Sequence, residues 1–124
     1  MIFTLEIPFS LLILEIKEEY LISLGLTSWR LFTVFPVGRA ARDPELQLGN
    51  DRFRGLMDFI SQTRKEGRIR ASYGCEGFLG EYEGFVRDHL YTCQAGRSIS
   101  SVMIDGSIAA CASIRSDLVQ GNIY

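Results

Sequence analysis

The stretch Cys93–Cys111, CQAGRSISSVMIDGSIAAC, decides the fold of the last part of this 124-residue chain. Two short runs of strand-forming residues flank the pair Asp105-Gly106. An Asp-Gly pair favours a two-residue type I′ turn, because both central residues of that turn need a positive φ. The sequence therefore predicts a β-hairpin in which Ile104 pairs with Ser107.

The same hairpin bears a cysteine at each end. In the predicted register Cys111 falls opposite Ser100, and Gly96 is free to take unusual dihedrals, so the segment after Cys93 can curl back toward Cys111. Two soft thiolates that converge at a small site suit zinc or an iron–sulfur cluster. Buried, inert thiols are the alternative, because free cysteine also packs as a small hydrophobe.

Composition indicates one soluble globular unit. The chain is 47% hydrophobic and 23% charged, with a formal net charge of −2, which allows a core of modest size. The charge balance is close to neutral and no basic stripe alternates with aromatic residues. We therefore expect neither nucleic acid nor a membrane as a partner.

The apolar N-terminus, residues 1–16, raises the question of a signal peptide or a membrane span. Two glutamates and a proline interrupt it, and no positively charged segment precedes it, so a buried strand or helix is the better interpretation. Without an export signal we expect a cytoplasmic protein. In that compartment the three cysteines fit metal ligands, catalytic thiols or core residues better than disulfides.

Helix and strand alternate upstream of the hairpin. Residues 15–24 predict a helix that ends before Gly25, and residues 28–37 predict a buried strand. One side of the first helix is expected to be apolar, with Ile16, Tyr20, Leu21 and Leu24.

The most regular helix pattern begins at residues 50–51 and ends before Gly67. Asn50 or Asp51 is expected to cap it. Its apolar residues recur at helical spacing, namely Phe53, Leu56, Met57 and Ile60. Residues 68–73 then predict a strand, and residues 81–90 predict a shorter helix.

This alternation is typical of βα units on a parallel sheet. Functional residues gather at the carboxyl ends of such strands, so Arg39 and Cys75, which follow the two predicted strands, are expected on the same side. A complete (β/α)₈ barrel takes about 250 residues. We therefore expect an α/β fold: a partial (β/α) barrel with its last two or three βα units in residues 1–90, then a cysteine-bearing β-hairpin in residues 91–124.

The hairpin also resembles a known domain. The pattern of Cys93, twelve residues, Gly106, four residues and Cys111 resembles the opening of the SPASM motif of radical S-adenosylmethionine (radical SAM) enzymes. The segments CQAG, IDGSIAAC and GNIY also resemble sequences of that domain. LFTVFPVGRA and YGCEGFLGEYE resemble the late barrel strands of peptide-modifying members, including those of lipoprotein-associated systems. The resemblance covers roughly residues 15–124.

This resemblance implies an oxidoreductase with an auxiliary [4Fe–4S] cluster. It implies Cys93 and Cys111 as two cluster ligands, Cys75 as a third, and a fourth from outside the chain. S-adenosylmethionine and a peptide or protein substrate belong to the complete family member. This sequence has neither the C-x-x-x-C-x-x-C triad that cleaves S-adenosylmethionine nor the second half of the SPASM motif. We therefore expect no activity from this chain alone.

Two other readings stay open. One is a small non-enzymatic metal-binding module that holds zinc or an iron–sulfur cluster through the same thiolates. The other is a truncated reading frame that folds poorly because its sheet edges are exposed. Arg39 and His89 are expected to be structural, and Glu76 and Glu83 do not amount to a paired-carboxylate site.

Overall fold

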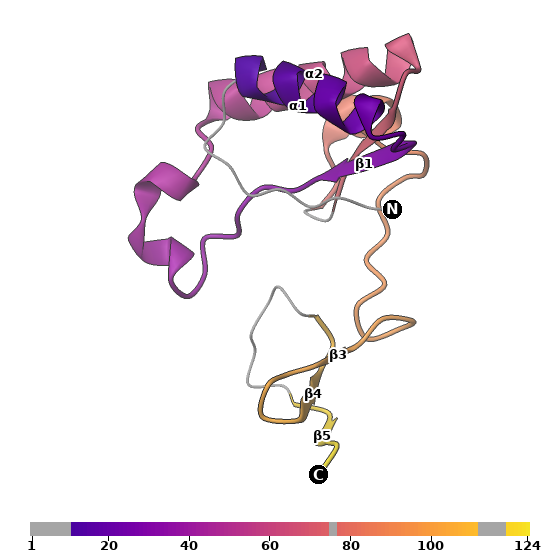
Figure 1. The fold of residues 1–124 in the computed structure, drawn as a ribbon. Helices are drawn as coiled ribbons and strands as arrows, with labels where there is room; N and C mark the ends of the chain where they lie inside the picture. The colour runs from indigo at the N-terminus through magenta and orange to yellow at the C-terminus, as the bar shows by residue number, and fades with distance from the viewer. Residues whose placement is uncertain (1–10, 75–76, 112–118) are drawn as a thin grey trace. The chain divides into compact units, whose positions relative to one another are not determined.

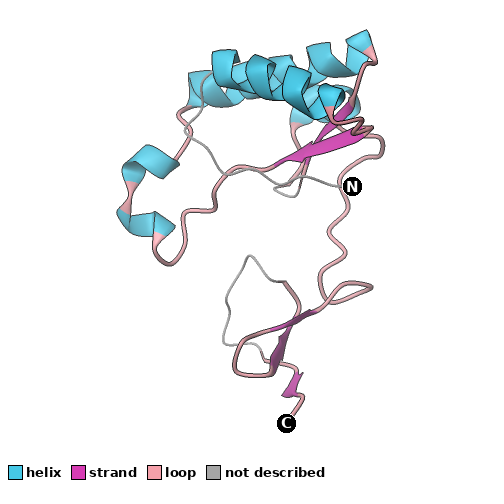
Figure 2. Cartoon of the chain, in the orientation of Figure 1, coloured by secondary structure: helices cyan, strands magenta, loops and turns pink. Residues whose placement is uncertain are grey.

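The chain folds as two compact units, Met1–Tyr91 and Thr92–Tyr124. The computed structural model describes residues 11–74, 77–111 and 119–124. The first unit packs helices on a two-stranded parallel sheet, and the second is a three-stranded antiparallel sheet (Figures 1 and 2). This confirms the predicted mixed α/β class, whereas the barrel itself stays a prediction.

The first unit is built on one βαβ crossover. Strands β1 (Ser28–Leu31) and β2 (Arg70–Tyr73) pair in parallel, and helix α2 (Asn50–Glu66) connects them. Both strands are shorter than predicted. The last hydrogen bond given for this ladder is the one that Gly74 N donates to Leu31 O at 2.8 Å, and no described residue pairs with residues 32–37 as a strand.

Helix α2 follows its sequence pattern closely. Leu56, Met57 and Ile60 are buried as predicted, and Gly67 ends the helix with a φ of 70°. The predicted cap is wrong, however. Gly49 is the N-cap, and its carbonyl accepts from Phe53 N at 2.9 Å, so Asn50 and Asp51 already lie inside the helix.

The core lies between the sheet and α2. Trp29, Leu31, Ala71 and Tyr73 occupy alternate strand positions and are all buried, which is the period expected for one face of a sheet. Each large apolar side chain that is fully buried contributes roughly 1.5–3 kcal/mol to stability. The core is completed by residues of the helices and of the turn before β2, namely Leu21, Leu56, Met57, Ile60, Ile69 and Val86.

Helix α1 (Leu11–Ser23) ends as predicted but faces another way. Leu26 N donates to Leu21 O and Gly25 N to Ile22 O, and Gly25 has a φ of 73°, which together form a Schellman motif. The predicted apolar side is wrong in three of its four members, because Ile16, Tyr20 and Leu24 are all more than half exposed.

The face of α1 was not decided by its own sequence. Its first turns are apolar nearly all round, so packing against α2 selects the inner face. That inner face carries Glu18 and Leu21, which are both buried. Figure 1 shows α1 and α2 along the same side of the sheet.

The last helix of the first unit is much shorter than predicted. Helix α3 covers only Glu83–Val86, after a 3₁₀ turn at Gly80–Tyr82. It stops because Arg87 is extended, with φ −141° and ψ 162°. Two further 3₁₀ turns, Ala40–Arg42 and Pro44–Leu46, lie in the loop before α2. No helix within the described ranges is both long and apolar enough to span a membrane.

The second unit contains the predicted hairpin with a third strand added. Strands β3 (Ser101–Val102), β4 (Ser107–Ala109) and β5 (Gly121–Asn122) lie in that order. The observed register pairs Ser101 with Ala109 and Val102 with Ile108. The predicted pairing of Ile104 with Ser107 is therefore wrong by one residue, as is the placement of Cys111 opposite Ser100.

The turn explains this shift. Met103 N donates to Ser107 O at 2.8 Å, and Gly106 N to Met103 O at 2.9 Å, so three residues rather than two lie in the loop. Gly106 has a φ of 79°, as expected for a three-residue loop that ends in a left-handed residue. Ser107 N also donates to the Asp105 carboxylate at 3.0 Å, which favours this turn over the two-residue one.

Candidate functional site

Both cysteines of the hairpin have free thiols. Cys93 is exposed and Cys111 is partly exposed. Cys111 lies two residues after β4, and Cys93 lies two residues before Ala95, which forms a β-bridge with Ile99. Cys75 and Glu76 lie outside the described residues.

The segment after Cys93 curls back, as the sequence predicts. The carbonyl of Gln94 accepts from three backbone N–H groups, those of Arg97, Ser98 and Ile99, each at 3.1 Å. Gly96 makes this turn with a φ of 74°. A Cβ added to Gly96 would lie 3.5 Å from the Cβ of Ala110, so the Cys93 segment lies against the residue directly before Cys111.

The turn at Gly106 is closed by the C-terminal residues. Ile123 N donates to Gly106 O at 3.0 Å, and Asn122 Nδ2 donates to Asp105 O at 3.1 Å. A Cβ on Gly106 would lie 2.5 Å from the ring of Tyr124, closer than real contacts allow. The segments IDG and GNIY of the sequence are therefore in contact, and a side chain at residue 106 would have to displace the side chains of Asn122 and Tyr124.

The donor set of this hairpin suits a soft metal, but it is incomplete. Thiolates are the ligands that zinc and iron–sulfur clusters prefer. No group of three or more histidine, cysteine or acidic side chains has a metal-binding arrangement in the part of the chain that the structure describes. A metal ion held by Cys93 and Cys111 would need further ligands from other residues.

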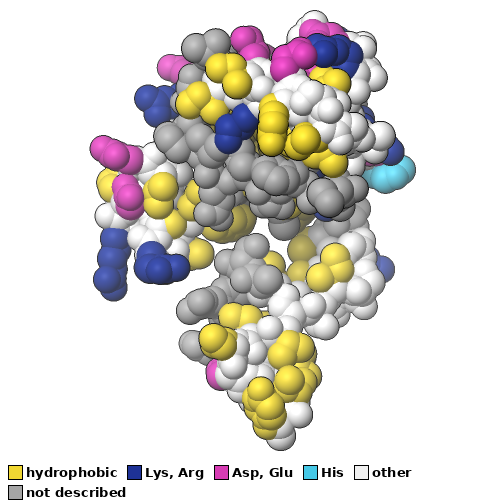
Figure 3. Space-filling view, viewed as in Figure 1, with side chains coloured by type: hydrophobic (Ala, Val, Ile, Leu, Met, Phe, Trp, Pro, Cys, Tyr) yellow, Lys and Arg dark blue, Asp and Glu magenta, His cyan; other side chains and the backbone are white. Residues whose placement is uncertain are grey.

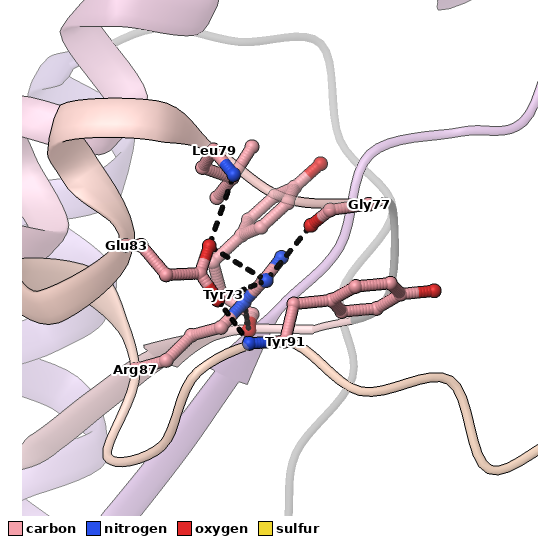
Figure 4. Close-up of polar contacts among 6 residues, drawn as sticks. All are labelled: Tyr73, Gly77, Leu79, Glu83, Arg87 and Tyr91. Atoms are coloured by element: carbon pink, nitrogen blue, oxygen red, sulfur yellow. Dashed lines mark hydrogen bonds and ion pairs between the residues drawn. The ribbon is translucent and has the colours of Figure 1, made fainter.

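A second organised site lies at the carboxyl end of β2, in the first unit. We define the Glu83–Arg87 cluster as Tyr73, Gly77, Leu79, Glu83, Arg87 and Tyr91 (Figure 4). Arg87 Nη1 contacts both Glu83 oxygens, at 2.9 and 3.0 Å, and donates to Gly77 O at 2.9 Å. Glu83 accepts from Leu79 N at 2.9 Å and also from Tyr91 N.

The cluster is buried, and its carboxylate is fully paired, whereas Arg87 Nη2 is buried without a hydrogen-bond partner among the described residues. The side chains of Glu83 and Arg87 are 3% and 9% exposed. Burial by itself raises the pKa of Glu83, but the N–H groups of Leu79 and Tyr91 and the Arg87 guanidinium outweigh it, so the pKa lies below its ordinary value. The guanidinium also lies over the rings of Tyr73 and Tyr91, at 5.6 and 5.0 Å from their centroids.

The Glu83–Arg87 cluster ties together the chain on both sides of α3. Gly77 and Leu79 follow Cys75 in sequence, and Tyr91 precedes Cys93 by two residues. The cluster thus fixes the chain next to two of the predicted ligands. Sequence reasoning missed this role of Glu83, although a Glu and an Arg four residues apart are a recognisable helical pair.

The remaining sequence candidates, Arg39 and His89, are not members of the Glu83–Arg87 cluster. Arg39 is exposed and precedes the 3₁₀ turn at Ala40–Arg42. His89 is exposed and lies after α3 rather than on a helix. Among the described residues neither belongs to a polar cluster, and their expected structural roles stay predictions.

Comparison of the chain with protein-family models, curated proteins and solved structures found no match. What the hairpin and the Glu83–Arg87 cluster can do therefore follows from their own residues.

Proposed function

We propose that this chain is the late-barrel and hairpin part of a radical SAM/SPASM-type iron–sulfur oxidoreductase that modifies a peptide or protein. Cys93 and Cys111 would be two ligands of its auxiliary [4Fe–4S] cluster, and Cys75 a third. The observation that carries this proposal is the hairpin itself. Its two ends bear accessible thiols, and the glycine at the motif position turns it with a positive φ.

The geometry gives the motif's glycine a physical role. Spacing between two cysteines alone does not require glycine at any position between them. Here a side chain at residue 106 would meet the ring of Tyr124 and would have to adopt an unfavourable φ. Glycine therefore sets the turn that returns the chain from Cys93 to Cys111.

The residues present fit part of a cluster site. When bound, a [4Fe–4S] cluster supplies one-electron chemistry or a binding position for substrate. The chain's own contribution is to hold thiolates: the curl at Gly96 turns the Cys93 segment toward Ala110, and β5 braces the turn. S-adenosylmethionine cleavage needs a C-x-x-x-C-x-x-C triad, which is not in this sequence, so the complete activity would need residues supplied from elsewhere.

A non-enzymatic metal-binding module is the second candidate. It is favoured by the compactness of Thr92–Tyr124, which forms a unit with its own three-stranded sheet. Such a unit would hold zinc through the same thiolates, with tetrahedral geometry completed by other ligands.

Anaerobic iron–sulfur reconstitution of the purified chain tests the proposal. We expect a broad visible absorption band and about four irons per chain, both lost in Cys93→Ala and in Cys111→Ala. Ser101→Ala, a small change on β3 that removes no thiol, is the matched control and should retain the band.

The outcomes separate the two candidates. Tight binding of zinc that depends on both cysteines, without an iron–sulfur band, would favour the metal-binding module. No metal in the wild-type chain, or metal content unchanged in both cysteine variants, would overturn both candidates.

A further inference from the structure

A groove lies between α1 and α2 in the first unit, apart from the Glu83–Arg87 cluster. Its cavity volume is about 470 Å³. Among the described residues, Arg68 is the one basic residue along it, and the other polar residues that line it are Glu15, Glu18, Glu19, Gln62, Thr63 and Glu66. Figure 3 shows acidic side chains on this helical layer, with Lys and Arg side chains among them. Four carboxylates against one guanidinium favour a cationic ligand.

Glu18 gives this groove an unsatisfied acceptor. The residue is only 6% exposed. Thr63 Oγ1 donates to Glu18 Oε2 at 3.0 Å, whereas Oε1 is buried and has no hydrogen-bond partner among the residues described. A buried carboxylate oxygen without a partner is costly, and α1 keeps Glu18 inside while Ile16 and Tyr20 are exposed.

The neighbouring polar groups leave two further acceptors. Arg68 pairs with Glu19, so the positive charge in the groove is already engaged. Gln62 Nε2 donates to Glu66 Oε1 at 2.8 Å, which orients the glutamine with its amide N–H toward the carboxylate. The carbonyl oxygen of Gln62 and the second oxygen of Glu66 then remain as acceptors.

We infer that this groove binds a small alkylamine, with its ammonium group on Glu18 and its methylene chain along Ile16 and Phe59. An ammonium group has three N–H donors. The acceptors along the groove are the free oxygens of Gln62 and Glu66 and the buried Glu18 Oε1, which the ammonium reaches when the side chains that cover this atom move aside. The aromatic ring of Phe59 adds a cation–π surface, and the apolar wall suits a hydrocarbon chain. A hard metal ion would instead need six or more oxygen ligands.

The charge state of Glu18 agrees with this assignment. Burial raises its pKa; Thr63 and Arg68 act against this rise, while Glu66 and Glu19 add to it. A bound ammonium favours the ionised carboxylate, so binding should release a proton from any protonated Glu18. Affinity should therefore fall as the pH is lowered through this raised pKa.

Titration of the full chain with 1,5-diaminopentane, followed by amide chemical shifts of α1 and α2, tests the inference. We expect saturable shifts, and an affinity at least tenfold weaker in Glu18→Gln. Glu45→Gln, an exposed glutamate outside the groove, should bind as the wild type does. Phe59→Leu should weaken binding several-fold and covers the case in which Glu18→Gln misfolds.

The neutral diol 1,5-pentanediol and Mg²⁺ are the ligand controls. Equal binding of the diol would show that charge is not recognised, and saturable binding of Mg²⁺ in place of the diamine would show a metal site. Either result overturns the inference, as does an unchanged affinity in Glu18→Gln. None of these results bears on the cysteine hairpin.

Discussion

At the scale of residues, Glu83 and Arg87 form the most buried ion pair among the described residues of the first unit. Two buried charges cost desolvation energy, and they are tolerated when hydrogen bonds satisfy them. Glu83 meets this condition with two backbone N–H groups and the guanidinium. Removing one member leaves the other charge buried and unpaired.

We predict that Glu83→Gln lowers the free energy of unfolding by about 3 kcal/mol. The amide keeps the shape of the side chain but leaves Arg87 without a counter-charge. Urea unfolding followed by the fluorescence of Trp29, the only tryptophan and a buried one, measures it. Glu81→Gln, an exposed glutamate two residues away, should change the value by less than about 0.5 kcal/mol, and equal losses in both variants would contradict the assignment.

The carboxylate of Glu83 should also make the stability of the protein depend on pH. The folded-state pKa of Glu83 is lowered from its ordinary value of 4.5, so its contribution to stability is present above that pH and is lost as the pH falls through the folded pKa. The pKa of Glu18 is raised instead, so Glu18 changes the stability with pH in the opposite direction. Between about pH 6 and pH 3, the free energy of unfolding should therefore fall more steeply with decreasing pH in the wild type than in Glu83→Gln. Parallel curves would contradict this.

At the scale of elements, the sequence predicts those parts whose signals are local. The apolar spacing and Gly67 give α2 within a residue of its ends, and the βαβ order gives the parallel pairing of β1 with β2. The inner face of α1 and the end of α3 depend on α2 and on Arg87, which local periodicity does not contain. The predicted hairpin register was wrong because an Asp-Gly pair fits both a two-residue and a three-residue loop. A hydrogen bond from the Ser107 backbone N–H to the Asp105 carboxylate favours the three-residue loop.

We predict that Gly106→Ala loosens the hairpin. A left-handed alanine costs roughly 1–2 kcal/mol, and its Cβ would meet the ring of Tyr124. Amide hydrogen exchange at Met103 and Ile123, whose N–H groups bond across this turn, should accelerate by roughly tenfold.

Gly84→Ala is the matched control for this substitution. Gly84 lies in α3 with no atom near its Cβ position and with no positive φ, so we expect the exchange of Met103 and Ile123 to stay unchanged. Retention of wild-type exchange in Gly106→Ala would show that the turn does not depend on glycine.

At the scale of the whole molecule, the sequence indicates which residues belong to the candidate site, but not the tertiary contacts that hold them in place. The cysteine spacing and the turn glycine are visible in the sequence. The approach of Gly96 to Ala110, the cover that Tyr124 gives Gly106, and the Glu83–Arg87 cluster join residues distant in sequence or across a loop. Such contacts appear only when the chain is folded, because no local period encodes them.

The division into Met1–Tyr91 and Thr92–Tyr124 predicts two separable unfolding transitions. Cooperative units in one chain open with their own free energies. Val86→Ala removes two methyl groups from a fully buried side chain of the first unit and should cost about 2 kcal/mol. We expect it to lower the urea midpoint reported by Trp29 while the exchange of Met103 and Ile123 stays at wild-type rates.

Gly106→Ala should give the reverse result, with faster exchange in the hairpin and an unchanged Trp29 transition. Phe85→Ala, an exposed change beside Val86, controls for the site of substitution and should leave both readouts near their wild-type values. If Val86→Ala accelerated exchange in the hairpin as much as it shifted the Trp29 transition, the two units would unfold as one. The arrangement of the hairpin thiols would then depend on the integrity of the first unit, and the metal binding proposed for them should weaken in Val86→Ala.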